Sequence, residues 1–188
     1  PLPAEEVVRD VDAVLVTHRH EDHLDATARR LLPRTVPVFC QPEDAEALAG
    51  LGLDARPVPD RVEWNGLTLH RTGGRHGTGA VAERLGPVSG FVIDGVYVAG
   101  DTVWCEAVAD AIARHEPRVA VVNAGGARFL EGDPIVMTAA DVGEVAARVP
   151  TVVAVHLEAI NHCVEPRSAV REAVPTAVVP ADGETVEI

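Results

Sequence analysis

The sequence predicts a mixed α/β fold. Short runs of β-branched residues alternate with amphipathic stretches along the 188 residues, and this alternation is typical of α/β proteins. Three apolar runs also end in a side chain that can bind a metal: His18 follows Ala-Val-Leu-Val-Thr, Asp101 follows Val-Tyr-Val-Ala-Gly, and His156 ends Val-Val-Ala-Val-His. Because sites in α/β folds form at the carboxyl ends of strands, we expect these three side chains to meet there.

The individual elements follow from composition and from helix start signals. Helices are expected after five positions, of which Thr138 is the best marked, because Asp141 three residues later resembles a capping box. The other four helices are expected after Asp22, Pro42, Thr102 and Glu165. Strands are expected at Ala13–Thr17, Val36–Cys40, Leu67–Arg71, Ser89–Ile93, Val96–Ala99, Val119–Asn123, Val152–His156 and Ala177–Val179.

Composition narrows the class of protein. The length suits one domain, so residues 1–188 are predicted to form a single domain. The 29 acidic and 16 basic residues give a net charge of −13, which disfavours binding to nucleic acid and favours a small-molecule substrate. All the basic residues are Arg, so Schiff-base chemistry and a P-loop are both excluded by the absence of Lys.

Cysteine usage and hydropathy bear on location. Cys40, Cys105 and Cys163 are widely and irregularly spaced, without a C-x-x-C pair, which favours a reducing, cytoplasmic setting. No apolar run approaches the roughly 20 residues of a membrane helix, so no membrane association is expected. The sequence leaves a homo-oligomer open.

The first strong chemical signal is the H-x-H-x-D-H motif at residues 18–23. Its three imidazoles and one carboxylate are His18, His20, His23 and Asp22. These donors suit zinc, with manganese as the alternative, and they exceed what one tetrahedral ion needs from one loop. An extended backbone would project His18 and His20 to the same side. Asp22 and His23, where the chain turns into a helix, would then face a second ion. The alternative interpretation is a solvated polar turn.

Four segments together resemble the metallo-β-lactamase superfamily: the H-x-H-x-D-H motif, Gly-Gly-Arg-His76-Gly-Thr-Gly, Ala-Gly-Asp101-Thr and Val-His156. The resemblance extends from about Asp12 to Gly183, and the chain looks like the branch that includes L-ascorbate-6-phosphate lactonase. It implies a four-layered αββα sandwich with two divalent metal ions at one edge, between the sheets. By position, it assigns His18, His20 and His76 to one ion, it assigns Asp22, His23 and His156 to the other, and it makes Asp101 the bridge.

The chain departs from this family pattern at its start. Family members usually have several strands before the H-x-H-x-D-H motif, and here 17 residues precede it. The resemblance therefore implies that N-terminal strands are missing from this sequence.

Several residues also have plainer interpretations. His76 alone would be a surface histidine, Asp101 alone could cap a helix near Thr102, and His156 alone could be a hydrogen-bonded core residue. Asn161 and His162 are candidates for substrate contact or catalysis because they follow His156, and a packed polar turn is the alternative. Outside the motifs, His70 and His115 are interpreted as structural and Cys163 as a small buried hydrophobe.

The sequence therefore predicts a binuclear metal-dependent hydrolase. A bridging hydroxide would cleave an ester, lactone, amide or phosphoester bond in a small substrate. Asp22, His162 and Asn161 are the predicted catalytic residues beside the metal ligands. Two alternatives stay open: a mononuclear iron oxygenase or redox enzyme on the same fold, and a non-catalytic metal-binding module.

Overall fold

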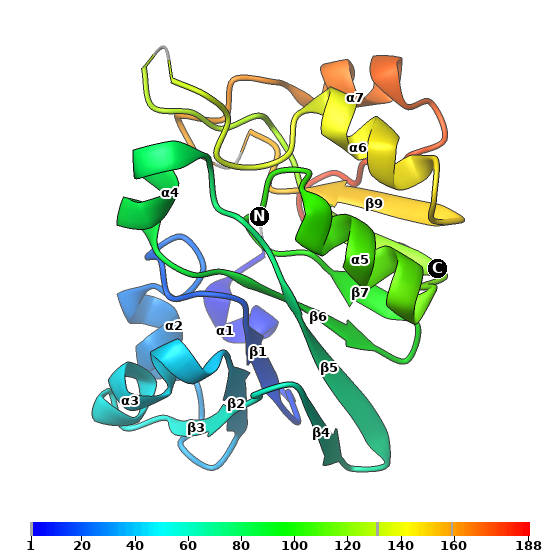
Figure 1. Ribbon diagram of the computed structural model, residues 1–188. Helices are drawn as coiled ribbons and strands as arrows, with labels where there is room; N and C mark the ends of the chain where they lie inside the picture. Colours follow the sequence, from blue (N-terminus) through cyan, green and yellow to red (C-terminus); the bar gives the residue numbers. More distant parts are fainter. Residues whose placement is uncertain (1, 131, 159) are drawn as a thin grey trace.

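The protein is built from two packed β-sheets with helices on both outer faces, as Figure 1 shows for the computed structural model. The structure describes residues 2–130, 132–158 and 160–188. The smaller sheet is parallel, with strands in the order β1-β2-β3: β1 (Val14–Val16), β2 (Pro37–Cys40) and β3 (Asp54–Pro57). Its helices are α1 (Ala4–Val7), α2 (Ala26–Leu31) and α3 (Pro42–Gly50).

The larger sheet follows the chain order from β4 to β9. The pairings from β4 to β7 are antiparallel, and the pairings of β7 with β8 and of β8 with β9 are parallel. Its strands are β4 (Arg61–Trp64), β5 (Leu67–Gly73), β6 (Ser89–Ile93), β7 (Val96–Val98), β8 (Val119–Asn123) and β9 (Thr151–Val155). The remaining helices are α4 (Gly79–Leu85), α5 (Glu106–His115), α6 (Ala139–Ala146) and α7 (Arg167–Ala173).

Side-chain alternation along the strands explains the layers. In β2, Val38 belongs to the cluster that joins the smaller sheet to its helices, whereas its neighbour Phe39 packs between the two sheets. In β6, Phe91 packs between the sheets and Val92 faces the helices of the other outer layer. Both faces of these two strands are thus buried, and the predicted four-layered αββα sandwich is confirmed.

Most predicted strands are present with boundaries that differ by one or two residues. Ser89–Ile93 and Val119–Asn123 match β6 and β8 at both ends. The strand predicted at Ala177–Val179 is wrong, because this segment contributes one isolated bridge, between Val153 and Val178. The short elements α1, β3, β4 and α4 were not predicted from the sequence.

The helix start signals placed α6 correctly and misplaced the start of α5. Thr138 and Asp141 form the predicted capping box at the start of α6. The helix expected directly after Thr102 begins at Glu106 with Cys105 at the N-cap position. Asp101 therefore caps no helix, and the plain interpretation of this residue is wrong.

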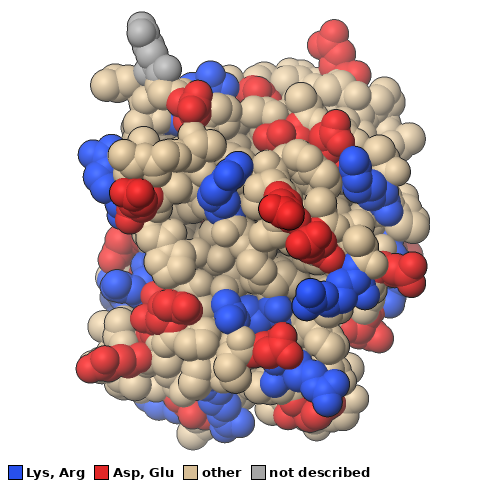
Figure 2. All heavy atoms as spheres, viewed as in Figure 1, with Lys and Arg blue, Asp and Glu red and all other residues tan. Residues whose placement is uncertain are grey.

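Two surface properties bear on the expected partners. On the face shown in Figure 2, acidic and basic side chains are interspersed, without a continuous basic surface. Among the described residues, none of the helices has the length and hydropathy to cross a membrane. The cytoplasmic setting and the homo-oligomer stay predictions.

Candidate metal centre

The carboxyl ends of strands from both sheets meet at one place. His18 lies two residues beyond β1, Asp101 three residues beyond β7, and His156 directly after β9. The side chains of these residues approach one another: Asp101 lies within 3.9 Å of both His18 and His156. The predicted convergence of strand ends is therefore confirmed.

Gly100 allows the close approach of the segments that follow β1 and β7. Its φ of 69° is in the left-handed region, which favours glycine. A Cβ atom at this position would lie 2.9 Å from the Cβ of Thr17 and 3.1 Å from the carbonyl oxygen of Ser89. A residue larger than glycine at this position would therefore require these segments to shift apart.

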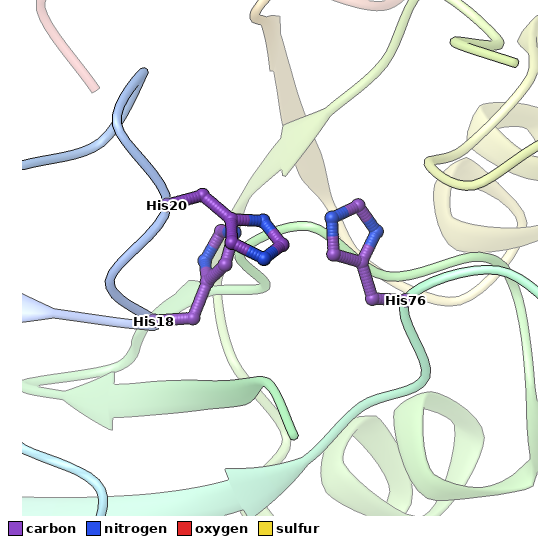
Figure 3. A group of neighbouring side chains, drawn as sticks. All are labelled: His18, His20 and His76. Atoms are coloured by element: carbon purple, nitrogen blue, oxygen red, sulfur yellow. The ribbon is translucent and has the colours of Figure 1, made fainter. Parts of the chain in front are cut away.

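One group of side chains consists of three histidines, His18, His20 and His76. Figure 3 shows His18 and His20 on one loop and His76 reaching toward them from another. The ring centroids are 4.5 Å apart for His18 and His20, 5.3 Å for His18 and His76, and 5.2 Å for His20 and His76. Their ligand-capable atoms lie within 4.8 Å of one another.

Hydrogen bonds at the outer nitrogens orient these rings. The Nδ1 atom of His18 lies 3.1 Å from Thr17 Oγ1, and Nδ1 of His76 donates to the carbonyl oxygen of Ile135 over 2.8 Å. In His20 the outer nitrogen is Nε2, which donates to the carbonyl oxygen of Leu85 over 3.1 Å. The other nitrogen of each ring is left for the cluster, and Nε2 of His18 is buried without a hydrogen-bond partner. A cation satisfies such an orphaned lone pair.

The second group contains Asp22, His23, Asp101 and His156, with ligand-capable atoms again within 4.8 Å of one another. The Oδ2 atom of Asp22 lies 3.3 Å from Nε2 of His156 and 3.6 Å from Nε2 of His23. The rings of His23 and His156 are stacked with centroids 5.3 Å apart. Nε2 of His23 is buried and, like that of His18, lacks a hydrogen-bond partner.

Asp101 lies between the two groups. Its Oδ2 atom is 3.2 Å from Nε2 of His23 in one group, and in the other it is 3.6 Å from Nε2 of His76 and 3.9 Å from Nε2 of His18. The side chain is almost fully buried. A carboxylate in this position can offer oxygen to cations on both sides.

The electrostatics keep the ligand atoms of His18, His76 and Asp101 free of protons at neutral pH. Burial, aided by the neighbouring His23, lowers the pKa of His18 to about 3, and burial also lowers the pKa of His76. Burial would raise the pKa of Asp101, but His23 holds it well below its usual range. Burial would lower the pKa of His23, but the carboxylate of Asp101 raises it overall. Neutral imidazoles and an ionised carboxylate are the donor set that suits a divalent cation such as zinc.

The backbone at His156 is strained. Its φ of 65° is in the left-handed region, which costs a non-glycine residue on the order of 1–2 kcal/mol. Cys163 supports this conformation, because its thiol donates to the carbonyl oxygen of His156 over 3.3 Å and lies 3.9 Å from the ring atom Nδ1. Cys163 also packs against the apolar cluster around Ala127, as expected for a small hydrophobe.

The two predicted catalytic residues after His156 differ in position. His162 borders the cavity at the metal centre, with its ring 5.6 Å from that of Phe129. Asn161 is exposed, and its Oδ1 atom lies 3.3 Å from Nδ1 of His162. Their catalytic roles stay predictions. His70 and His115 pair with each other at 4.8 Å between centroids and belong to neither group.

The sequence did not single out two features of the site. Asn123, the last residue of β8, donates to Oδ1 of Asp101 over 2.6 Å. The rule that identified His18 and Asp101, a polar side chain at a strand end, also applies to Asn123. The second feature is an apolar part of the cavity lining, which a search for ligand types cannot detect: Leu85, Ala127, Phe129, Ile135 and Val136.

Comparison with known proteins places this geometry in a family. Residues 1–157 match the family described as "Beta-lactamase superfamily domain". The chain is 33% identical to UPF0173 protein YddR of Bacillus subtilis over 98% of its own length and 79% of that protein. The chain therefore belongs to the beta-lactamase superfamily. Within it, the chain belongs with the UPF0173 proteins, several of which are named metal-dependent hydrolases.

Two solved structures are similar along the whole chain. A possible metal-dependent hydrolase from Veillonella parvula has a TM-score of 0.93 and 36% identity, covering 100% of this chain and 80% of the other. Isothiocyanate hydrolase from Delia radicum gut bacteria has a TM-score of 0.91 and 33% identity with the same coverage. The narrower resemblance to the L-ascorbate-6-phosphate lactonase branch and the missing N-terminal strands stay predictions.

Proposed function

We propose that the chain is a binuclear metal-dependent hydrolase that acts on a small substrate. His18, His20 and His76 would hold one divalent ion, zinc or manganese. Asp22, His23 and His156 would hold the other, and Asp101 would bridge the two. The observation that carries this proposal is the position of Asp101 Oδ2, which lies within 3.9 Å of ring nitrogens from both groups.

When bound, the two ions would ionise a water molecule at neutral pH and polarise the electrophilic group of the substrate. The chain's own residues orient the reactants. Asp22 is partly exposed at the cavity, where its free carboxylate oxygen can accept a proton from water. His162 reaches the same cavity and can deliver a proton to the leaving group, with Asn161 holding its ring.

The proposed chemistry fits the cleavage of an ester, lactone, amide or phosphoester bond, and one similarity adds a further candidate. The isothiocyanate hydrolase covers all of this chain at 33% identity, so isothiocyanates are the first substrates to test. Hydrolysis of R–N=C=S consumes one water and gives an amine, R–NH₂, and carbonyl sulfide. Its electrophilic carbon is attacked by water as an ester carbonyl is.

The test combines metal content with hydrolysis. The protein is stripped of metal, reloaded separately with zinc and manganese, and measured for ions per chain and for hydrolysis of isothiocyanates, esters, lactones and phosphoesters. We expect two ions per chain and loss of hydrolysis in His23→Asn, with His115→Asn as the matched histidine control outside the site. One iron per chain with oxygen consumption would favour the oxygenase, and two ions without any hydrolysis would favour a metal-binding module.

A further inference from the structure

The cavity beside the metal centre has two chemically different kinds of lining. Its volume is about 230 Å³, and its polar lining comes from Glu21, His162 and five of the proposed ligands: His20, Asp22, His76, Asp101 and His156. The rest of the lining is apolar. We propose that the apolar part, formed by Leu85, Ala127, Phe129, Ile135 and Val136, is a subsite for an apolar substituent of the substrate. This inference rests on the proposed hydrolase function and specifies the substrate class.

The inner part of the apolar wall is fixed in place. Ala127 and Val136 are fully buried, and Ile135 is 3% exposed. Two backbone hydrogen bonds close the segment, from Ile135 to Ala127 over 2.7 Å and from Gly126 to Met137 over 2.9 Å. A wall held in this way offers a preformed surface to a ligand.

The wall is also coupled to the proposed ligands. The carbonyl oxygen of Ile135 accepts the hydrogen bond from Nδ1 of His76, and the carbonyl oxygen of Leu85 accepts the one from Nε2 of His20. Two residues therefore both line the apolar subsite and orient a ligand ring. A substituent seated on this wall lies at a defined place relative to the reacting bond.

Phe129 forms the outer part of the subsite. Its side chain is large and apolar, yet it is 48% exposed, and its ring contacts His162 at 5.6 Å between centroids. Covering an exposed aromatic ring with a ligand is favourable because apolar surface leaves water. Phe129 is therefore placed to set how large a substituent the site accepts.

The charges of the lining favour a neutral substituent. None of the described residues that border the cavity is Arg, and the chain contains no Lys. The nearby Arg19 and Arg84 border a different cavity. Glu21, Asp22 and Asp101 are acidic, so a carboxylate or phosphate placed away from the metal ligands finds no cationic partner. The expected substrate carries an alkyl or aryl group.

The test has a binding part and a kinetic part, both on the zinc-loaded full chain. Binding of 1-butanol, 1-pentanol and 1-hexanol is followed by methyl NMR. We expect shifts at Leu85, Ile135 and Val136, with affinity rising about fourfold per added methylene. Phe129→Ser should lower hexanol affinity by about fivefold or more, whereas Leu51→Ser, at an exposed apolar residue of the smaller-sheet layer, should leave it unchanged.

The kinetic part uses n-alkyl isothiocyanates from methyl to hexyl. We expect kcat/KM to rise with chain length in the wild type and to rise less steeply in Phe129→Ser. Alkanols that leave the wall residues unshifted, or that bind equally at every length, would overturn the subsite, even if the isothiocyanates are hydrolysed. Hexanol binding at the wall without hydrolysis of any substrate would support the subsite and count against the hydrolase function. The two ideas can therefore fail separately.

Discussion

Nδ2 of Asn123 donates a hydrogen bond to Oδ1 of Asp101 over 2.6 Å, which ties the end of β8 to the carboxylate between the two ligand groups. The bond occupies one oxygen of Asp101 and leaves Oδ2 near the ring nitrogens of His18, His23 and His76. Asn123 thus fixes the rotation of the carboxylate, with Oδ2 toward three of the proposed ligands and Oδ1 3.9 Å from Nε2 of His156. Partners of this kind orient a ligand without touching the metal.

Replacing Asn123 with Ala should weaken metal binding. The change leaves a buried carboxylate oxygen of Asp101 without its donor and frees the carboxylate to rotate. We expect zinc affinity to fall about 10- to 100-fold, the usual effect of losing such a partner. Competition with a chelator measures the zinc affinity. Asn123→Asp should also weaken zinc binding, because it removes the N–H donor and adds a negative charge beside Asp101. Wild-type zinc affinity in Asn123→Ala would show that Asp101 needs no support from β8.

Asp101→Asn tests the bridge itself. The substitution removes one negative charge between the two proposed cations and replaces an oxygen with an amide that ligates poorly. We expect the second ion to bind weakly and turnover to fall at least about a hundredfold, the scale for losing a central electrostatic element. Asp25→Asn is the matched control, because Asp25 caps α2 and Asn caps about as well. Two tightly bound ions and wild-type turnover in Asp101→Asn would exclude the bridge.

Among the strands, the sequence predicted those at the centre of the larger sheet better than those at the sheet edges. Apolar, β-branched runs such as Ser89–Ile93 and Val119–Asn123 are buried on both faces and match β6 and β8 at both ends. By contrast, β3 and β4 contain Asp-Ala-Arg-Pro and Arg-Val-Glu-Trp, with exposed charged side chains, and lie at sheet edges. β3 pairs with β2 across α3, so its local composition carried no signal. β4 pairs with β5 through the turn at Asn65 and Gly66, which both have a positive φ, and this Asn-Gly pair is a hairpin signal that the strand prediction missed.

A similar distinction applies inside the site. Residue type and position after a strand singled out His18, Asp101 and His156, and the structure brings these three side chains together. Phe129 and Ile135 are ordinary apolar residues, and their place at the cavity follows from how the loop after β8 packs against α4. Asn123 lay within reach of the strand-end rule, but the hydrogen bond to Asp101 requires the three-dimensional structure.

Asp22→Ala should reduce the metal content from two ions per chain to one. Asp22 contributes the second carboxylate of the group with His23 and His156, while the three histidines of the other group do not depend on it. Native mass spectrometry after exhaustive zinc reloading gives the count. His70→Asn, in the histidine pair outside the centre, should keep two ions. If Asp22→Ala also retains two, Asp22 is not a required ligand.

Thr138→Ala should destabilise the fold without affecting the metal centre. Thr138 accepts from the backbone N–H of Asp141, and the Asp141 carboxylate accepts from the backbone N–H of Thr138. Losing such a cap costs about 1 kcal/mol, or roughly 2–4 °C in melting temperature for a chain of this size. Calorimetry measures the melting temperature, and zinc titration measures the zinc affinity. A changed zinc affinity would show that α6 influences the centre.

The metal-free protein should lose stability as the pH falls from 7 to 5. The pKa of His18 is about 3 in the folded protein and about 6.5 in the unfolded chain. Between these values the unfolded state binds more protons than the folded state, so stability decreases with decreasing pH, by about 2 kcal/mol at pH 5 from His18 alone. The lowered pKa of His76 acts in the same direction.

Two other shifted groups of the centre do not contribute to the decrease between pH 6 and 5. The raised pKa of His23 gives stability that is fully present below about pH 6.5 and is lost at higher pH, so it stays constant between pH 6 and 5. The lowered pKa of Asp101 gives stability that is lost only below about pH 4.

Urea unfolding of the metal-free protein at pH 7, 6 and 5 should show a decrease in the free energy of unfolding that is clearly smaller in His18→Asn than in wild type. His115→Asn, at a more exposed histidine whose pKa is also lowered by burial, should retain most of the decrease. Equal pH dependence in wild type and His18→Asn would mean that His18 is not held neutral by burial.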